Sequence, residues 1–269
     1  MTADAAVPAA SAAQPPASPT GPDETVAETV AENAAENGAE AASDAVELLG
    51  LVAQVAHTEF VRLAADSQAA PSIDQRLALS RCAAECVQGR DRVLARIAEL
   101  GGDPVAAMAR HEHVLDDFDA RTAPGSWWER LLTAYVGYGV ADDFCRLAAE
   151  GLDERSRTLV LEVLGAGSPA ELAAAELDAA SADDTVLAAR LALWGRRLVG
   201  ESLSVVQRLL AQRPALERLL RRARTDRAAG GDDAEPAANS RPRAGESAAV
   251  LGELTAEHTR RMNRLRLTA

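Results

Sequence analysis

The chain has 269 residues and a formal net charge of −13, and all 28 of its basic residues are arginine. Aromatic residues make up only 3% of it, while alanine, leucine and valine dominate, so we expect an aliphatic core built from helices. With three cysteines, no run of about 18 apolar residues and no basic region at its start, the sequence argues against a disulfide-rich secreted protein, a membrane protein and a secretory leader. A cytoplasmic protein is the expectation.

Residues 1–44 consist mainly of alanine, proline, serine and glutamate and contain almost no large apolar residue. Such a segment cannot bury enough apolar surface to offset the entropy of ordering it, so we predict a disordered acidic tail. Within AETVAENAAENGAE, glutamates recur at every fourth position, and like charges at that spacing repel on a helix. Any helix here is therefore predicted to be transient, and residues 45–269 are predicted to form the folded domain.

Helical periodicity begins at Val46 and predicts a first helix to about residue 67. The sequence Ser72-Ile73-Asp74-Gln75 has the form of a capping box, which predicts the start of a second helix that ends near Leu100. One face of the first helix carries a carboxylate within an apolar stripe, which consists of Leu48, Val52, Val55, Glu59 and Leu63.

The remaining elements are separated by one long and several short connections. We predict helices at about residues 126–151, 183–212, 214–224 and 246–267, a further helix that begins after the turn at Gly151-Leu152-Asp153, and a flexible linker at 225–245. About 25 residues without a long period separate the second helix from the third. A bundle of two helical hairpins joined by one long crossover is the ferritin-like arrangement. The fold prediction is all-α: a ferritin-like four-helix bundle with additional C-terminal helices.

Charge is unevenly distributed along the chain. Residues 1–45 carry eight acids and no arginine, residues 46–189 carry 24 acids and 12 arginines, and residues 190–269 carry nine acids and 16 arginines. The basic final third admits two interpretations, a phosphate-facing patch or an ordinary surface whose arginines pair with acids of the same chain. The arginines concerned are Arg196, Arg197, Arg208, Arg213, Arg218, Arg221, Arg222, Arg224, Arg260 and Arg261.

Two of the predicted bundle helices carry candidate metal ligands. In di-iron bundles of this kind, two helices each supply one carboxylate and the other two each supply Glu-x-x-His. Glu59 is a candidate because a carboxylate on an apolar stripe is costly unless it is paired or binds metal. Glu85 is a second candidate, but the histidine position three residues later is Gln88, whose neutral amide oxygen is a weaker ligand.

Several segments resemble the ferritin-like proteins of actinobacteria grouped with MiaE, the non-haem di-iron hydroxylase of isopentenylated tRNA adenosine. The likeness lies in AAECVQGRDRVLARIAELG, DDFDARTAP, AYVGYGVADDF, RTLVLEVLGAGSPAE, ALWGRRLVGESLS and AEHTRRMNRL, and it covers most of residues 46–224 and 247–267. The resemblance implies a ferritin-like fold, iron as the cofactor and tRNA as the partner.

The sequence departs from the ligand pattern that the resemblance implies. Tyr138 stands at the acid position of the third helix, and Ala166 and Pro169 stand where the fourth helix should carry Asp-x-x-His. Ser168-Pro169 also has the form of a helix start, which predicts a break in the fourth helix. Asp142 and Glu162 lie one turn from the lost positions, and a rebuilt two-metal site or a weak single-metal site would have to use them.

Three functions follow from these observations. The first is a ferritin-like, MiaE-like protein with an impaired di-iron site that binds no metal tightly and acts as a non-catalytic interaction or regulatory module, dimeric through the helix at 183–212. The second is an active non-haem di-iron tRNA hydroxylase. The third is an RNA-binding helical protein without chemistry. In the first function, Glu59 and Glu85 are expected to pair with arginine or to hydrogen-bond Tyr138. No DNA or membrane partner is expected.

Overall fold

The computed structural model describes residues 22–166, 169–182, 184–229 and 242–268. The chain divides into two units, Met1–Glu40 and Ala41–Ala269. Every regular element in the described ranges is helical, and none is a strand, which confirms the all-α prediction. The elements in chain order are α1 (Pro22–Ala69), α2 (Ile73–Glu99), α3 (Pro104–Ala109), α4 (Asp116–Arg121), α5 (Trp127–Leu132), the π-helical turn η1 (Thr133–Gly137), α6 (Tyr138–Ala149), α7 (Glu154–Gly165), α8 (Ala170–Ala182), α9 (Thr185–Gln212), α10 (Pro214–Ala229) and α11 (Pro242–Arg264).

In the first unit, the described residues 22–40 are helical and belong to α1. This differs from the disordered segment that we predicted for residues 1–44, of which residues 1–21 lie outside the described residues. The physical reason is composition, because alanine has the highest helix propensity of all residues. Repulsion between glutamates four residues apart costs only a few tenths of a kcal/mol per pair. Glu32, Glu36 and Glu40 are exposed, as the absence of large apolar residues predicts.

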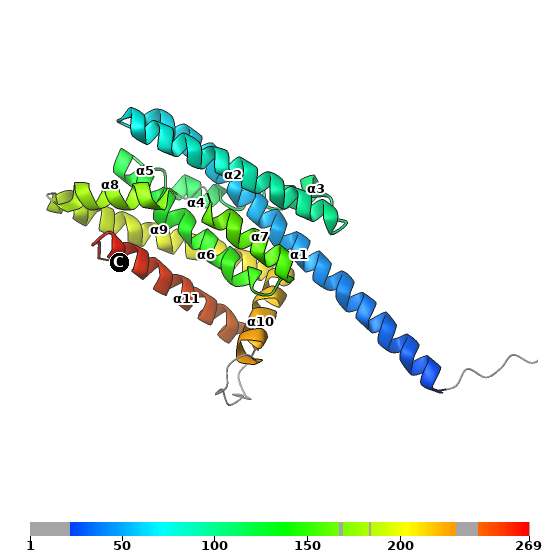
Figure 1. The fold of residues 1–269 in the computed structure, drawn as a ribbon. Coiled ribbons are helices and arrows are strands. Elements are labelled where there is room, and N and C mark those ends of the chain that lie inside the picture. Colours follow the sequence, from blue (N-terminus) through cyan, green and yellow to red (C-terminus); the bar gives the residue numbers. More distant parts are fainter. Residues whose placement is uncertain (1–21, 167–168, 183, 230–241, 269) are drawn as a thin grey trace, which may run out of the picture. The chain divides into compact units, whose positions relative to one another are not determined.

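In the second unit, α1 and α2 form one helical hairpin, and α5–η1–α6 with α7–α8 forms the second (Figure 1). The short helices α3 and α4 lie in the long crossover between the hairpins. Contacts join α6 to α7 within the second hairpin and α2 to α7 between the two, so the hairpins pack against each other. A large, mainly aliphatic core runs through them and includes Leu48, Val52, Val136, Phe144 and Val160, and a smaller cluster between α1 and α2 includes Leu63, Leu79 and Cys86. The predicted bundle with one long crossover is confirmed.

The ends of the bundle helices follow local sequence rules. The hydroxyl of Ser72 accepts a hydrogen bond from the amide of Gln75 at 3.2 Å, and the Gln75 side chain accepts one from the amide of Ser72 at 3.1 Å. The predicted capping box is therefore present. The predicted break in the fourth bundle helix is also present, since α7 ends at Gly165 and α8 begins at Ala170. The predicted N-cap Ser168 lies outside the described residues.

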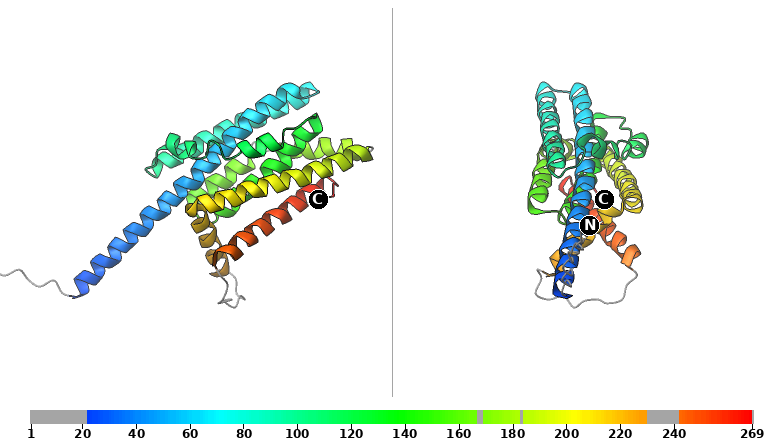
Figure 2. Two further views of the ribbon diagram at one scale, coloured as in Figure 1. Left: turned by 180° about the vertical axis from the view of Figure 1, so that it is seen from behind. Right: turned by 90° about the vertical axis from the view of Figure 1, so that its right-hand side faces the viewer.

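The C-terminal helices cover the η1–α6 side of the bundle. Contacts join α9 to η1, α10 to α6, and α11 to both α6 and α9. Figure 2 shows α9 and α11 side by side, in yellow and red. The helix α10 begins at the predicted residue but continues to Ala229, and α11 begins at Pro242, so both ends of the linker predicted at 225–245 are helical, while residues 230–241 lie outside the described residues.

Two described stretches, Glu32–Ala69 and Glu154–Ala182, are long and apolar enough to cross a membrane by length and composition alone. This result differs from the sequence expectation that no stretch qualifies. The first stretch is 56% buried over its most apolar window, as expected for a helix that supplies the core of a bundle. The second combines α7 with α8, which are separate helices, and it is 31% buried.

Candidate metal centre

A polar cavity of about 440 Å³ lies among the bundle helices and α11. Three of the five residues predicted as metal ligands line it: Glu59 from α1, Glu85 from α2 and Asp142 from α6. Three arginines line it as well, namely Arg146 from α6 and Arg261 and Arg264 from α11. The cavity therefore holds carboxylates and guanidinium groups together.

Glu59 and Asp142 are the cavity carboxylates whose pKa is raised by burial. Burial and the nearby charge of Asp142 raise the pKa of Glu59 well above its usual range, although Arg146 acts in the opposite direction. Burial raises the pKa of Asp142 to about 6 against the pull of Arg146 and Arg261. The thiol of Cys86 lies 3.9 Å from Oε2 of Glu59. Oδ1 of Asp142 is buried and has no hydrogen-bond partner within the described ranges.

Arginine side chains supply the positive charge next to these carboxylates. Arg261 donates two hydrogen bonds to Asp143, each 2.6 Å long, and the two side chains are only 13% and 10% exposed. Arg146 lies 3.6 Å from the same carboxylate. Gly139 permits this arrangement, because a Cβ atom at that position would come within 2.7 Å of Nε of Arg261. The backbone of α6 thus makes room for a guanidinium group.

Gln88 and Glu162 are not among the residues that line the cavity. Gln88 is exposed on α2. Glu162 is also exposed, and its carboxylate forms an ion pair with Arg92 across the contact between α2 and α7. Glu162 thus faces the contact with α2, whereas Ala166, one turn later, lines the cavity. The prediction of Glu162 and Gln88 as ligands near Glu59 is therefore not supported by their positions.

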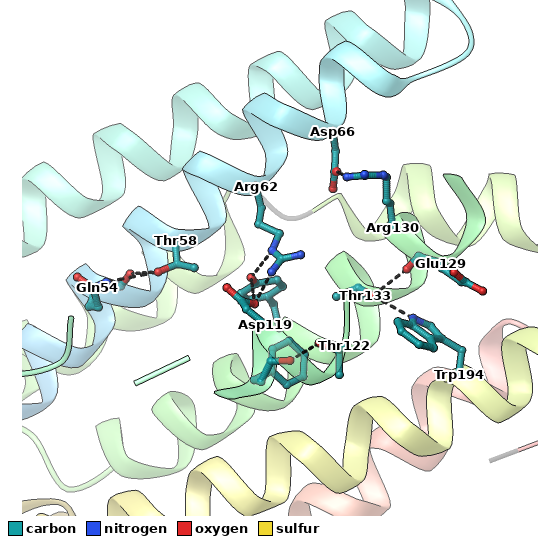
Figure 3. Close-up of polar contacts among 12 residues, drawn as sticks. Gln54, Thr58, Arg62, Asp66, Asp119, Thr122, Glu129, Arg130, Thr133 and Trp194 are labelled. Atoms are coloured by element: carbon teal, nitrogen blue, oxygen red, sulfur yellow. Dashed lines mark hydrogen bonds and ion pairs between the residues drawn. The ribbon is translucent and has the colours of Figure 1, made fainter. Parts of the chain in front are cut away.

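Tyr138 belongs to a different polar cluster from the one we predicted for it. Its hydroxyl accepts a hydrogen bond from Nε of Arg62 at 2.8 Å and donates one to Asp119 at 3.4 Å. Arg62 also forms an ion pair with Asp119, and Figure 3 shows this pair between α1 and the crossover. The expected hydrogen bond from Tyr138 to Glu59 or Glu85 is thus replaced by one with Arg62. Tyr138 and Asp142 lie one turn apart in α6, yet only Asp142 lines the cavity.

The donor set does not fit a di-iron centre. Iron in such a centre needs several anionic oxygens and imidazole nitrogens. Within residues 22–166, 169–182, 184–229 and 242–268, no group of three or more histidine, cysteine, aspartate or glutamate side chains is arranged to hold a metal ion. The cavity instead places arginines among its acids. A metal ion would have to bind against their positive charge.

The sequence analysis did not predict four charged residues that line the cavity, namely Arg146, Glu171, Arg261 and Arg264, and it also missed Asp143, which binds Arg261. Arg261 was assigned there to a basic surface patch together with Arg260. The signal that separates the two arginines is the line of buried residues on α11, which is Val250, Leu254, His258 and Met262. Arg261 borders this line, whereas Arg260 is 60% exposed and pairs with Glu257 of the same helix.

Other arginines of the basic final third pair with acids of the chain. Arg218 and Arg222 of α10 both bind the fully buried Asp44 of α1. Arg224 donates a hydrogen bond of 2.9 Å to the backbone oxygen of Glu246. Further pairs join Arg208 to Asp117 and Arg227 to Glu253. These arginines connect helices of the chain to one another.

Comparison with known proteins agrees with this architecture. A family model described as a ferritin-like domain of actinomycetes matches residues 40–223, which is more than half of the chain. The match ends within α10 and does not include α11, which carries Arg261. No curated protein matches the sequence. The chain belongs to the family of ferritin-like domain proteins of actinomycetes.

Proposed function

We propose that this protein is a MiaE-like member of the ferritin-like family that has lost its iron chemistry and acts through its surfaces as an interaction module. The observation that carries the proposal is the presence of Arg146 and Arg261 among the carboxylates of the cavity. A cation is attracted to these acids only where no other positive charge already compensates them. Here Arg261 binds Asp143 through two hydrogen bonds and lies close enough to Asp142 to lower its pKa.

The state of the carboxylates supports the same proposal. A metal ligand must be deprotonated to bind, so a site whose acids resist ionisation binds metal less well. Burial raises the pKa of both Glu59 and Asp142. In addition, the positions that should supply imidazole hold Gln88 and Pro169. Gln88 does not line the cavity, and proline has no side-chain donor.

The interaction partner that we propose is a second copy of the chain, bound through the first half of α9. Most apolar residues of α9 are buried in its own core, which narrows the dimer surface expected from the sequence. Val186 and Leu193, seven residues apart, are 69% and 62% exposed. They lie on one face, because about two helical turns separate them. Light scattering after size exclusion should give a dimer for the native chain and a monomer for Val186→Glu/Leu193→Glu.

Metal content tests the loss of iron chemistry. The protein is expressed with added iron, purified without chelating resin and analysed by inductively coupled plasma mass spectrometry beside Glu59→Gln/Asp142→Asn. We expect background iron in both proteins. Stoichiometric iron in the native chain that disappears in the double variant would overturn the proposal. Gln88→Ala is a matched control, since Gln88 is exposed and does not line the cavity.

One observation favours a second candidate function, an active non-haem di-iron hydroxylase of tRNA. Glu59, Glu85 and Asp142 come from three bundle helices and line the same cavity. This function requires about two irons per chain and oxygen consumption that depends on a tRNA substrate. Both should be lost in Glu85→Ala. The metal analysis above therefore separates the two candidates before any substrate is sought.

A further inference from the structure

The helix α11 is attached to the bundle by an apolar line along one of its faces. Val250, Leu254, Met262 and Leu265 are each at most 2% exposed. The fit against α9 is close, because a Cβ atom at Gly195 would come within 2.4 Å of Cε of Met262. Contacts of α11 also reach α6 and η1. We call this line of buried residues (Val250, Leu254, Met262 and Leu265) the apolar seam; it explains why α11 packs where it does but not why Arg261 lies at its edge.

Arg261 extends from the apolar seam into the polar cavity. Its guanidinium group binds Asp143 and occupies the space that a Cβ atom at Gly139 would fill. Arg261 also lines the cavity together with Glu59 and Asp142. Burial lowers the pKa of Arg261, but the hydrogen bonds and charge of Asp143 outweigh that effect and keep it protonated. A buried charge of this kind is stable only while its partner is in place.

The cavity and the helix therefore depend on each other electrostatically. Without Arg261, Asp143 would keep only Arg146, at 3.6 Å, and Asp142 would lose one of the two positive charges that favour its ionised form. Without the carboxylates, Arg261 would be a buried cation with no partner. The family match ends at residue 223, so Arg261 lies outside the matched domain, whereas Asp142 and Asp143 lie within it.

The seam also contains a feature that weakens the attachment. His258 is 2% exposed, and neither of its ring nitrogens has a hydrogen-bond partner within the described ranges. These nitrogens give up hydrogen bonds to water when α11 packs on the bundle and receive none in return. An apolar residue at this position would bind more tightly. The attachment of α11 thus depends strongly on its arginine.

We propose that the polar cavity, with the adjoining surface of α6 and α9, is a binding site for an arginine-bearing amphipathic helix, and that this chain's own α11 is its occupant. Arg261 binds Asp143 and brings its positive charge close to the cavity carboxylate of Asp142, and in this proposal α11 can leave the site as a unit. The inference rests on the proposed function in one respect, since it assigns these carboxylates to arginine and not to metal.

Hydrogen–deuterium exchange of the full-length protein tests the proposal. In Arg261→Ala, protection of amides in residues 246–265 should fall on the order of 10- to 100-fold, the expected effect of losing hydrogen bonds between charged groups. Protection of α2 should stay unchanged. Arg260→Ala is the matched control, because Arg260 is exposed and pairs only within α11. This readout does not involve iron, so its failure and the failure of the non-catalytic assignment are separate results.

A second variant and a peptide keep the test decisive if Arg261→Ala weakens the whole fold. Gly139→Ala retains Arg261 but places a methyl group where its guanidinium lies. It should lower the protection of residues 246–265 by less than Arg261→Ala does. A labelled peptide of residues 242–268 should bind the Arg261→Ala protein and not the native chain, and the same peptide with its own Arg261→Ala change should bind neither. The proposal would be overturned if α11 protection were unchanged in Arg261→Ala. It would also be overturned if both variants lost protection equally in α2 and α11, or if the peptide bound equally well with and without its arginine.

Discussion

Two polar clusters include residues of α6, and they differ in how their buried charged groups are paired. In the first, Arg62, Asp119 and Tyr138 bind one another, so each group has a partner from a neighbouring element. In the second, around Glu59 and Asp142, a carboxylate oxygen is left without a partner and the charge is balanced by an arginine from α11. The first cluster is complete within the matched domain, whereas the second requires a helix beyond it.

The difference between the clusters indicates what each one does for the protein. A fully paired cluster fixes the crossover against the bundle and leaves no site for a ligand. A cluster with excess acid retains an affinity for positive charge, which here is met by Arg261. Substitutions in the two clusters should therefore change stability with different magnitudes and, in one case, with opposite sign.

The largest effect is expected from Arg261→Ala. Removing Arg261 removes the two charged hydrogen bonds that attach α11, so the free energy of detaching α11 should fall by roughly 1.5–3 kcal/mol and α11 should unfold before the bundle. Urea denaturation followed by circular dichroism measures this change. Arg260→Ala should change it by less than about 1 kcal/mol, since exposed ion pairs contribute little. Equal losses in the two variants would contradict the role given to Arg261.

Asp142→Asn should act in the opposite direction. The pKa of Asp142 is about 6 in the folded protein and 3.8 in its ordinary state, so the ionised carboxylate opposes folding. Above pH 6 the variant should be more stable than the native chain by roughly 1–3 kcal/mol. This advantage should shrink as the pH falls from 6 and should vanish near 3.8, where the native carboxyl is protonated in both states. A constant difference across this range would show that burial of charge is not the cause.

Tyr138→Phe should have a smaller effect in the first cluster. The substitution removes the hydroxyl that accepts a hydrogen bond from Arg62 but leaves the ring and the ion pair between Arg62 and Asp119. A loss of about 1 kcal/mol in the free energy of unfolding is expected. Thermal denaturation at pH 7 measures it. A gain in stability would mean that the hydroxyl is a burden in this cluster, as the ionised Asp142 is in the other.

The smallest effects are expected at the two predicted ligands that lie elsewhere. Gln88→Ala and Glu162→Gln replace exposed residues and should each change the free energy of unfolding by less than about 0.5 kcal/mol. The same urea titrations provide the measurement. A loss above 1 kcal/mol in either variant would mean that the boundary drawn between cavity and surface is misplaced.

The sequence was sufficient for the bundle because its rules are local. The capping box at Ser72 and the break before Ala170 each depend on a few adjacent residues, and the long crossover follows from counting. Glu59 was identifiable because a carboxylate within an apolar stripe is costly. The helical state of residues 22–44 was missed because repulsion between glutamates was weighted above the helix propensity of alanine.

The pairing of Arg261 with Asp143 could not be predicted in the same way. The two residues are far apart in the chain, and nothing in the local pattern near Arg261 indicates that α11 packs on α6. The position of Tyr138 was missed for another reason, since the predicted helix at 126–151 was taken to be α-helical throughout, including Thr133–Gly137. Predictions based on periodicity fail where the period itself changes.

The π-helical turn η1 has a consequence for the length of this helix. A π-helical turn closes over one residue more than an α-helical turn, so the segment between α5 and α6 contains one surplus residue. Deleting a residue there would yield a continuous α-helix with both flanks in their present orientation. A deletion within α6 would instead rotate one flank by about 100° and carry Asp142 or Phe144 away from its neighbours. Deletion of one residue should accordingly be tolerated at Thr133–Gly137 and not within α6.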